Sequence, residues 1–335
     1  MALEVTAGGE VTADMRVTRS MRYRVGGRVV DSRTGAAPDS AFVALSQNFP
    51  TGESSGTSRD SRSGVFEFQG VIPGTYTLGA QIPQRSTAAF NNSIVEEIAA
   101  DLATPKGRVF VDVSGNLADV VITISLPGSI EGRLTLNGEP LSNLPDLDRI
   151  HPGLRPFALG GTIPIGPSAN IAADGTFHLG GISEDDYKFG ITGVPAGFYV
   201  EKAEMGTVDL LRDSSHLSPP LTGTLDVVLR RGVGEVRGTV TDAQSRPAPG
   251  VQVVLVPDER LRLDLYATSI TNKSGVFTMT NVPPGNYRVF SWESLAPYGY
   301  FNPDVLSRDE SFGQPVRVTG SSGFSVEVRT ISAER

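Results

Sequence analysis

The stretch GVFEFQGVIPGTYTL at positions 64–78 decides the fold, because two related stretches follow it, GTFHLGGISEDDYKF at 175–189 and GVFTMTNVPPGNYRV at 275–289. In each stretch apolar residues alternate with polar ones on both sides of a short turn, which is the pattern of half-buried β-strands. Two of the three turns contain Pro-Gly. We therefore predict that each stretch forms a strand, a tight turn and a second strand, paired as a hairpin.

Equivalent aromatic positions in the three stretches predict the core of each unit. A tyrosine lies early in every second strand, and a tyrosine entering a late strand of a sandwich can bond its hydroxyl back to the backbone, an arrangement known as the tyrosine corner. We expect the phenylalanines to be buried and the tyrosines to form such corners. The positions are Phe66, Phe177, Phe277, Tyr76, Tyr187 and Tyr287.

Two further blocks recur around these stretches, and the whole pattern repeats every 105 residues or so, roughly the size of one β-sandwich. An opening strand with a central glycine begins at Arg24, Ser129 and Glu235, and two strands flanking a polar turn close each unit. A repeat of this length is far longer than a solenoid repeat. The sequence thus predicts an all-β chain, a tandem array of three immunoglobulin-like β-sandwiches.

The predicted boundaries between the units fall in short linkers. Because Pro127-Gly128 and Arg231-Gly232 leave little free chain, we expect neighbouring units to touch and the array to be a semi-rigid rod. Residues 1–20 resemble the closing block, so we interpret them as the last strands of a preceding unit in a longer natural chain. The three sandwiches are then expected at 21–127, 128–232 and 233–335.

Helical patterning is nearly absent from the sequence. The exception is 92–102, where Ser93 and Glu96 form a capping box ahead of Ile98. We expect either a short helix or an irregular loop in that stretch.

The three blocks together resemble the carboxypeptidase regulatory-like domain, a transthyretin-like sandwich. The resemblance is carried by the pattern G-x-F-x-F-x-x-V-x-P-G-x-Y-x-L, which stands at Gly64 to Leu78 and, with Val289 last, from Gly275. The middle unit departs from the pattern at its turn, which reads Ser183-Glu184-Asp185-Asp186. The resemblance implies seven strands in each sandwich and a non-catalytic accessory role, in which the domain spaces, docks or binds glycans. The chain is also similar to long multi-module surface proteins of soil bacteria.

Composition narrows the choice of partner and compartment. The formal net charge of −8 and the absence of a basic cluster argue against nucleic acid and anionic membranes as partners. The lack of cysteine excludes disulfides, thiolate metal sites and cysteine nucleophiles. No apolar run is long enough for a membrane-spanning helix, and the first residues show no signal-peptide pattern.

Fragments of catalytic motifs occur, each in an unsuitable context. Gly52-Glu53-Ser54-Ser55-Gly56 matches G-x-S-x-G, but a nucleophile elbow needs a strand-to-helix turn and this match lies in a polar interstrand loop. The acidic runs Glu96-Glu97 and Glu184-Asp185-Asp186 lack flanking aromatics that would raise a carboxyl pKa. The three histidines show no metal-ligand spacing; they are His151, His178 and His216. We predict no enzymatic activity, no cofactor and no metal site.

The one concentration of chemistry is SWESLAPYGYFNPD at 291–304, which contains the only tryptophan of the chain. Aromatic faces beside acids and amides can stack on and hydrogen-bond sugars, but they also clamp protein contacts or cap the end of a sandwich. All three interpretations stay open at this point. The candidate contact residues are Trp292, Glu293, Tyr298, Tyr300, Phe301 and Asn302.

Two functional interpretations are consistent with these sequence features. The first is a structural, adhesive or spacer segment of a larger bacterial surface or secreted protein, which fits tandem repetition without catalytic chemistry. The second is a carbohydrate-binding module accessory to an enzyme or receptor outside this chain, because sandwiches host many functions. The expected partners are other domains of the same longer protein, with glycans or a surface protein as further candidates, and the expected location is extracellular, cell-surface or periplasmic.

Overall fold

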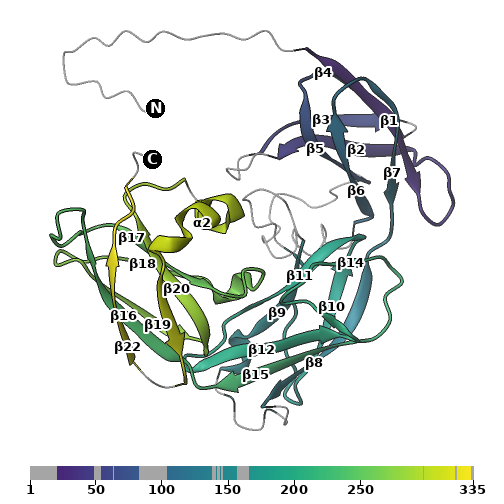
Figure 1. The fold of residues 1–335 in the computed structure, drawn as a ribbon. Helices are drawn as coiled ribbons and strands as arrows, with labels where there is room; N and C mark the ends of the chain where they lie inside the picture. The colour runs from purple at the N-terminus through teal and green to yellow at the C-terminus, as the bar shows by residue number, and fades with distance from the viewer. Residues whose placement is uncertain are drawn as a thin grey trace, which may run out of the picture.

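The structure is a computed structural model whose secondary structure is almost entirely β, as predicted. The strands lie in six sheets, and each sheet takes all its strands from 23–124, from 128–231 or from 234–329 (Figure 1). We call these three groups the first, second and third sandwiches; the domain boundaries themselves stay a prediction. The described residues are 21–48, 54–62, 64–82, 104–137, 141, 144, 146–156, 166–296, 298–320 and 323–332.

The first sandwich has two facing sheets, in the orders β4-β1-β7 and β3-β2-β5-β6. Its opening and closing strands, β1 and β7, run parallel, whereas the other pairings are antiparallel. One hydrophobic cluster fills the space between the sheets, with Phe66 and Phe68 from one sheet and Leu78 from the other. The strands are β1 (Tyr23–Asp31), β2 (Ser40–Asn48), β3 (Ser54–Arg62), β4 (Val65–Val71), β5 (Gly74–Gln81), β6 (Lys106–Val113) and β7 (Leu117–Ile124).

The third sandwich repeats this topology strand for strand. Its sheets have the orders β19-β16-β22 and β18-β17-β20-β21, and its opening and closing strands again pair in parallel. The strands are β16 (Gly234–Thr241), β17 (Gln252–Pro257), β18 (Ala267–Ile270), β19 (Val276–Val282), β20 (Gly285–Trp292), β21 (Gln314–Val318) and β22 (Gly323–Arg329). Short helices lie at η2 (Leu263–Leu265), η3 (Gly299–Phe301), α2 (Pro303–Asp309) and η4 (Glu310–Phe312).

The second sandwich departs from the other two. Its sheets have the orders β10-β8-β15-β12-β13 and β14-β11-β9, so its described residues form eight strands where seven were predicted. The chain between β11 and β15 forms three strands: β12 and β13 join the sheet of β15, and β14 pairs with β11. The first and third sandwiches have one strand in the corresponding segment, β6 or β21. The strands are β8 (Gly128–Leu136), β9 (His151–Pro156), β10 (Thr176–Ile182), β11 (Asp185–Thr192), β12 (Phe198–Met205), β13 (Val208–Asp209), β14 (Ser215–Leu217) and β15 (Thr224–Arg231), with η1 at Leu147–Arg149.

The predicted hairpins are wrong, because the two strands of each stretch belong to opposite sheets. In the first sandwich β4 pairs with β1, whereas β5 pairs with β2 and β6, and the corresponding strands of the other sandwiches behave in the same way. The turn therefore carries the chain across the core. Alternation shows which residues of a strand face the core. The pattern is the same whether two strands pair within one sheet or lie in opposite sheets that face each other across the core.

The tyrosines hold these crossings as tyrosine corners, as expected. The hydroxyl of Tyr76 donates to the carbonyl of Ile72 at 3.0 Å, and that of Tyr287 donates to Pro283 at 2.9 Å. Tyr187 makes the equivalent hydrogen bond with the backbone of Ser183. The rings are buried, together with the phenylalanines predicted for the core.

A left-handed residue precedes each crossing. The φ angles are 76° at Gly70, 77° at Gly181 and 56° at Asn281. Glycine and asparagine are the residues that adopt this conformation at least cost. The third sandwich thus places a side chain where the other two have none.

The helix predicted within 92–102 lies outside the described residues. A helix that the sequence analysis missed, α2, lies between β20 and β21. Its signal is Asn302-Pro303-Asp304: the Asn302 side chain accepts from the backbone N of Asp304 at 2.9 Å, and Pro303 occupies the first turn. None of the described helices is long and apolar enough to cross a membrane.

Candidate functional site: the joints between sandwiches

The aromatic stretch of the third sandwich divides into a buried and an exposed part. Trp292 is only 5% exposed, and its ring stacks on Phe290 with centroids 5.3 Å apart. The indole N–H donates to the carboxylate of Asp309 at 2.8 Å. Tyr300 is also buried, and both rings belong to a second hydrophobic cluster that includes Leu306 of α2. Trp292 and Tyr300 therefore attach α2 to the outer face of the sheet.

The other predicted contact residues lie at the surface. Tyr298 is 52% exposed and Phe301 37%, and their rings stack with centroids 6.4 Å apart. Glu293 is exposed, and Asn302 is occupied as the cap of α2. Ligand contact at this surface stays a prediction.

The structure brings two histidines to acidic side chains. His178 Nδ1 lies 2.8 Å from Glu131 on the exposed face of its sheet, and His216 Nδ1 lies 3.1 Å from Asp186. His151 is at the start of β9. Within the described residues, no three His, Asp or Glu side chains are grouped to hold a metal ion.

The fragments of catalytic motifs find no catalytic surroundings in the described chain. Ser54 of the G-x-S-x-G match begins strand β3 and not a strand-to-helix turn, and Gly52 and Glu53 lie outside the described residues. Glu96 and Glu97 also lie outside them. Asp185 and Asp186 are on β11; Asp186 meets His216 of the same sandwich, and Asp185 contributes to a contact between sandwiches described below.

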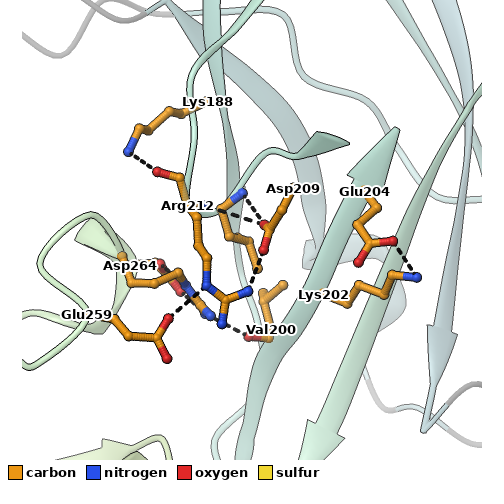
Figure 2. Close-up of polar contacts among 10 residues, drawn as sticks. Lys188, Val200, Lys202, Glu204, Asp209, Arg212, Glu259 and Asp264 are labelled. Carbon is orange, nitrogen blue, oxygen red and sulfur yellow. Dashed lines mark hydrogen bonds and ion pairs between the residues drawn. The ribbon is translucent and has the colours of Figure 1, made fainter. Parts of the chain in front are cut away.

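Figure 2 shows the joint between the second and third sandwiches, which we call the second joint. Arg212 of the second sandwich reaches across it: its Nε donates to Glu259 of the third at 2.8 Å, while its Nη1 donates to Asp209 at 2.6 Å. The covalent linker beside this bridge contains only Gly232 and Val233 between β15 and β16.

Arg262 makes the reverse connection from the third sandwich. Its side chain is almost fully buried, and its Nη2 donates to the carbonyl of Val200 in the second sandwich at 3.2 Å. Asp264 accepts from the same guanidinium at 2.8 and 2.7 Å. A buried guanidinium needs such partners because desolvation of its charge is costly. Burial lowers the pKa of Arg262, but the pair with Asp264 outweighs it and the net shift is upward.

Two more side chains close the second joint. Lys188 Nζ donates to the carbonyl of Leu261 in the third sandwich at 3.0 Å and to that of Arg212 at 2.9 Å. Asn281, the left-handed residue of the third sandwich, accepts a hydrogen bond from the backbone N of Gly197 at 3.0 Å. Only the third sandwich has asparagine at this position, so the contact has no counterpart at Gly70 or Gly181.

Two charged side chains of this joint have shifted pKa values. Burial raises the pKa of Asp209, but hydrogen bonds from the backbone of Leu211 and from Arg212 lower it further, and the net shift is downward. Burial lowers the pKa of Lys188, with Asp213 and other carboxylates opposing the shift.

The joint between the first and second sandwiches, the first joint, is built differently. Arg108 of β6 forms an ion pair with Asp185 of β11, and both side chains are largely buried, at 19% and 11% exposure. Burial raises the pKa of Asp185 to about 6, against the lowering effect of Arg108. Burial also raises the pKa of Tyr187 to about 12. The linker, Ser125 to Pro127, lies between β7 and β8.

A cleft of about 320 Å³ lies at the first joint. On the first sandwich its lining includes Phe42, Ala44, Gly79, Lys106 and Arg108. On the second it includes Pro156, Pro167, Ser183, Glu184 and Asp185.

Sequence reasoning predicted that neighbouring units touch, but it did not identify the residues that form either joint. Arg108, Arg212 and Arg262 are far apart in the sequence and belong to no motif. The one available signal was Asn281, which stands where the other two stretches have glycine. The Ser183-Glu184-Asp185-Asp186 turn was noted for lacking Pro-Gly, and in the structure three of its residues, Ser183, Glu184 and Asp185, lie at the first joint.

The third sandwich also matches a family model. It combines the opening strand, the Pro-Gly crossing and the Tyr287 corner. Residues 235–292 match the carboxypeptidase regulatory-like domain. This regulatory-like match runs from β16 to the end of β20 and includes the residues of the third sandwich that form the second joint. It ends before α2 begins.

No curated protein matches the whole chain or part of it. Among solved structures, this chain is similar to the TIE protein of Bacillus anthracis, with 11% sequence identity and a TM-score of 0.23. The likeness covers 92% of this chain but only 50% of the length of the TIE protein. The Streptococcal ancillary pilin is similar at 11% identity over 92% of this chain and 99% of its own, with a TM-score of 0.27. BcpA, the major pilin subunit of Bacillus cereus, is similar at 14% identity, with a TM-score of 0.20. That likeness covers 92% of this chain and 99% of BcpA.

Proposed function

We propose that this chain is a non-enzymatic spacer segment of a larger bacterial surface or secreted protein, in which consecutive sandwiches are held in a fixed relative orientation. The observation that carries the proposal is the second joint, where buried Arg262 and bridging Arg212 connect sandwiches that only Gly232 and Val233 link covalently. Domains that act as independent beads need no such contacts. The partners are then the adjoining domains of the same protein, and the location is outside the cytoplasm.

The absence of cysteine makes the proposal directly testable by site-specific spin labelling. Asp226 on β15 and Thr278 on β19 are exposed strand residues of the second and third sandwiches. Cysteines at these two positions are the only thiols in the chain. We expect double electron–electron resonance to give one narrow distance distribution across the second joint.

A second label pair supplies the matched measurement on the first joint. Thr123 on β7 is exposed and can be combined with the same Asp226 position. Broad distributions at both joints, of the width given by freely reorienting domains, would contradict a spacer of defined geometry. A narrow distribution that broadens in Arg262→Met supports it.

A further inference from the structure

The cleft at the first joint has a hollow floor. Its side on the first sandwich is the outer face of sheet β3-β2-β5-β6, where Ala44 and Gly79 are paired across adjacent strands. Because neither residue has a side chain larger than a methyl group, the sheet surface is depressed there. A Cβ atom built on Gly79 would meet no other atom within 4 Å.

A buried hydroxyl without a partner lines this cleft. Ser183 is 5% exposed, and its Oγ has no hydrogen-bond partner in the part of the chain that the structure describes. A hydroxyl removed from water without a new partner is costly, and native proteins keep such a group where a bound molecule completes it. Asp185 also lines the cleft, and its carboxylate pairs with Arg108.

The charges around the cleft favour an uncharged molecule. Lys106 and Arg108 oppose Glu184 and Asp185, so the formal charges of the lining cancel at neutral pH. A ligand with a net charge of either sign is therefore not attracted electrostatically by such a lining. A ligand hydroxyl suits it, because a hydroxyl both donates and accepts and can satisfy Ser183 and the carboxylate together.

The position of the cleft argues against a peptide strand. The cleft covers β2 and β5, which are the inner strands of the four-stranded sheet and already paired on both sides. It also reaches the edge strand β6, where the backbone of Lys106 is already bridged to Ser125. Strand addition needs an open edge with free backbone N–H and C=O groups. The apolar part of the lining, including the partly exposed ring of Phe42, instead suits the C–H face of a small ring.

We propose that this cleft binds an uncharged polyhydroxylated ring compound, one or two sugar units, with the ring over Gly79 and its hydroxyls on Ser183 and Asp185. The volume is at the lower end of the range for small-molecule sites, about 300 to 1,000 Å³, which limits the ligand to this size. The site is separate from the Tyr298–Phe301 surface and independent of the spacer function.

The test uses the full chain and neutral disaccharides as probes: maltose, cellobiose, lactose and N,N′-diacetylchitobiose. Saturation-transfer NMR identifies binders and isothermal titration calorimetry measures their affinity. Sialyllactose and trialanine serve as the anionic and peptide comparisons. We expect saturable binding of at least one neutral disaccharide and weaker or no binding of the two comparison probes.

Three variants locate the site. Gly79→Leu fills the hollow from an open position, so it should weaken binding at least tenfold without lowering the melting temperature. Ser183→Ala should weaken binding about threefold to tenfold, the range for one hydrogen bond. Ser125→Ala is the matched control, because Ser125 is also a buried serine whose Oγ lacks a partner in the described chain, and it does not line the cleft.

The proposal is overturned if no neutral disaccharide binds, if trialanine or sialyllactose binds more tightly, or if Gly79→Leu binds as the unchanged chain does. A loss in Ser125→Ala as large as in Ser183→Ala would also overturn it. These outcomes leave the distance measurements across the joints unaffected, so this proposal and the spacer proposal fail separately.

Discussion

The two joints hold neighbouring sandwiches together through different kinds of contact. At the second joint, cations from both sandwiches reach across the boundary, and backbone carbonyls and carboxylates accept their hydrogen bonds. At the first joint, the described contact is one buried ion pair, Arg108–Asp185, beside an open cleft. The difference shows that neighbouring sandwiches can be joined either by a closed polar contact or by one that leaves room for another molecule.

The joints also respond to pH in opposite directions. The pKa of Asp185 is about 6, above the ordinary 3.8, so between these values the folded chain holds a proton that the unfolded chain lacks. Its contribution to stability therefore falls as pH rises through that window. The pKa of Asp209 is lowered, so its contribution is present above the ordinary value and is lost as pH falls.

The largest effect is expected from Arg262→Met, which removes the buried centre of the second joint. The carbonyl of Val200 and the carboxylate of Asp264 lose their partner. We expect the free energy of unfolding of the third sandwich to drop by about 3 kcal/mol, the lower end for breaking a buried pair. Urea denaturation followed by fluorescence of Trp292, the chain's only tryptophan, measures it.

Arg237→Met is the control for this change. Arg237 is an exposed arginine of the same sandwich, paired with Glu235 on its own strand. Its loss should change stability by no more than about 0.5 kcal/mol. Equal effects of the two variants would show that Arg262 carries no special weight at the joint.

The next effect is the pH dependence of the first joint. The upward shift of Asp185, to about 6 from 3.8, corresponds to about 3 kcal/mol of disfavoured ionisation. Asp185→Asn removes this titration. The melting temperature of the unchanged chain, relative to the variant, should therefore fall as pH rises from 4 to 6.5 and level off above that. A difference that stays constant across calorimetric scans in this range would contradict the buried, titrating carboxyl.

A smaller effect is expected from Asn281→Gly. Glycine adopts the left-handed conformation of this position readily, so the backbone tolerates the change and only the side-chain bond to Gly197 is lost. We expect a loss of about 1 kcal/mol in the Trp292 urea transition and a wider distance distribution at the second joint. The reverse change at the equivalent position, Gly70→Asn, should leave that distribution unaltered.

The smallest effect is expected from Glu259→Gln, because the Arg212–Glu259 bridge is half exposed. Water and salt screen such a pair, so its loss should cost about 0.5 kcal/mol or less and should vanish in molar salt. A cost that persists in high salt would mean that this bridge matters as much as buried Arg262.

The local pattern predicted the elements of this protein but not their partners. Alternating residues around Phe66, Phe177 and Phe277 identify core-facing strands, because period two depends only on neighbouring residues. The same alternation was wrongly interpreted as hairpins, since it does not distinguish pairing within a sheet from crossing between sheets. Trp292 was singled out as a candidate contact residue, but its burial depends on α2, which the sequence analysis did not predict.

What the sequence determined by itself is the all-β fold class, the repeated strands, and the buried phenylalanines and tyrosine corners, all of which follow from residues close together in the chain. Only the tertiary structure decided the joints. Arg262 meets Val200 and Arg108 meets Asp185 across more than sixty positions of sequence. The residues next to a charged side chain in the sequence do not indicate its partner, because the partner is determined by how whole sheets pack against each other.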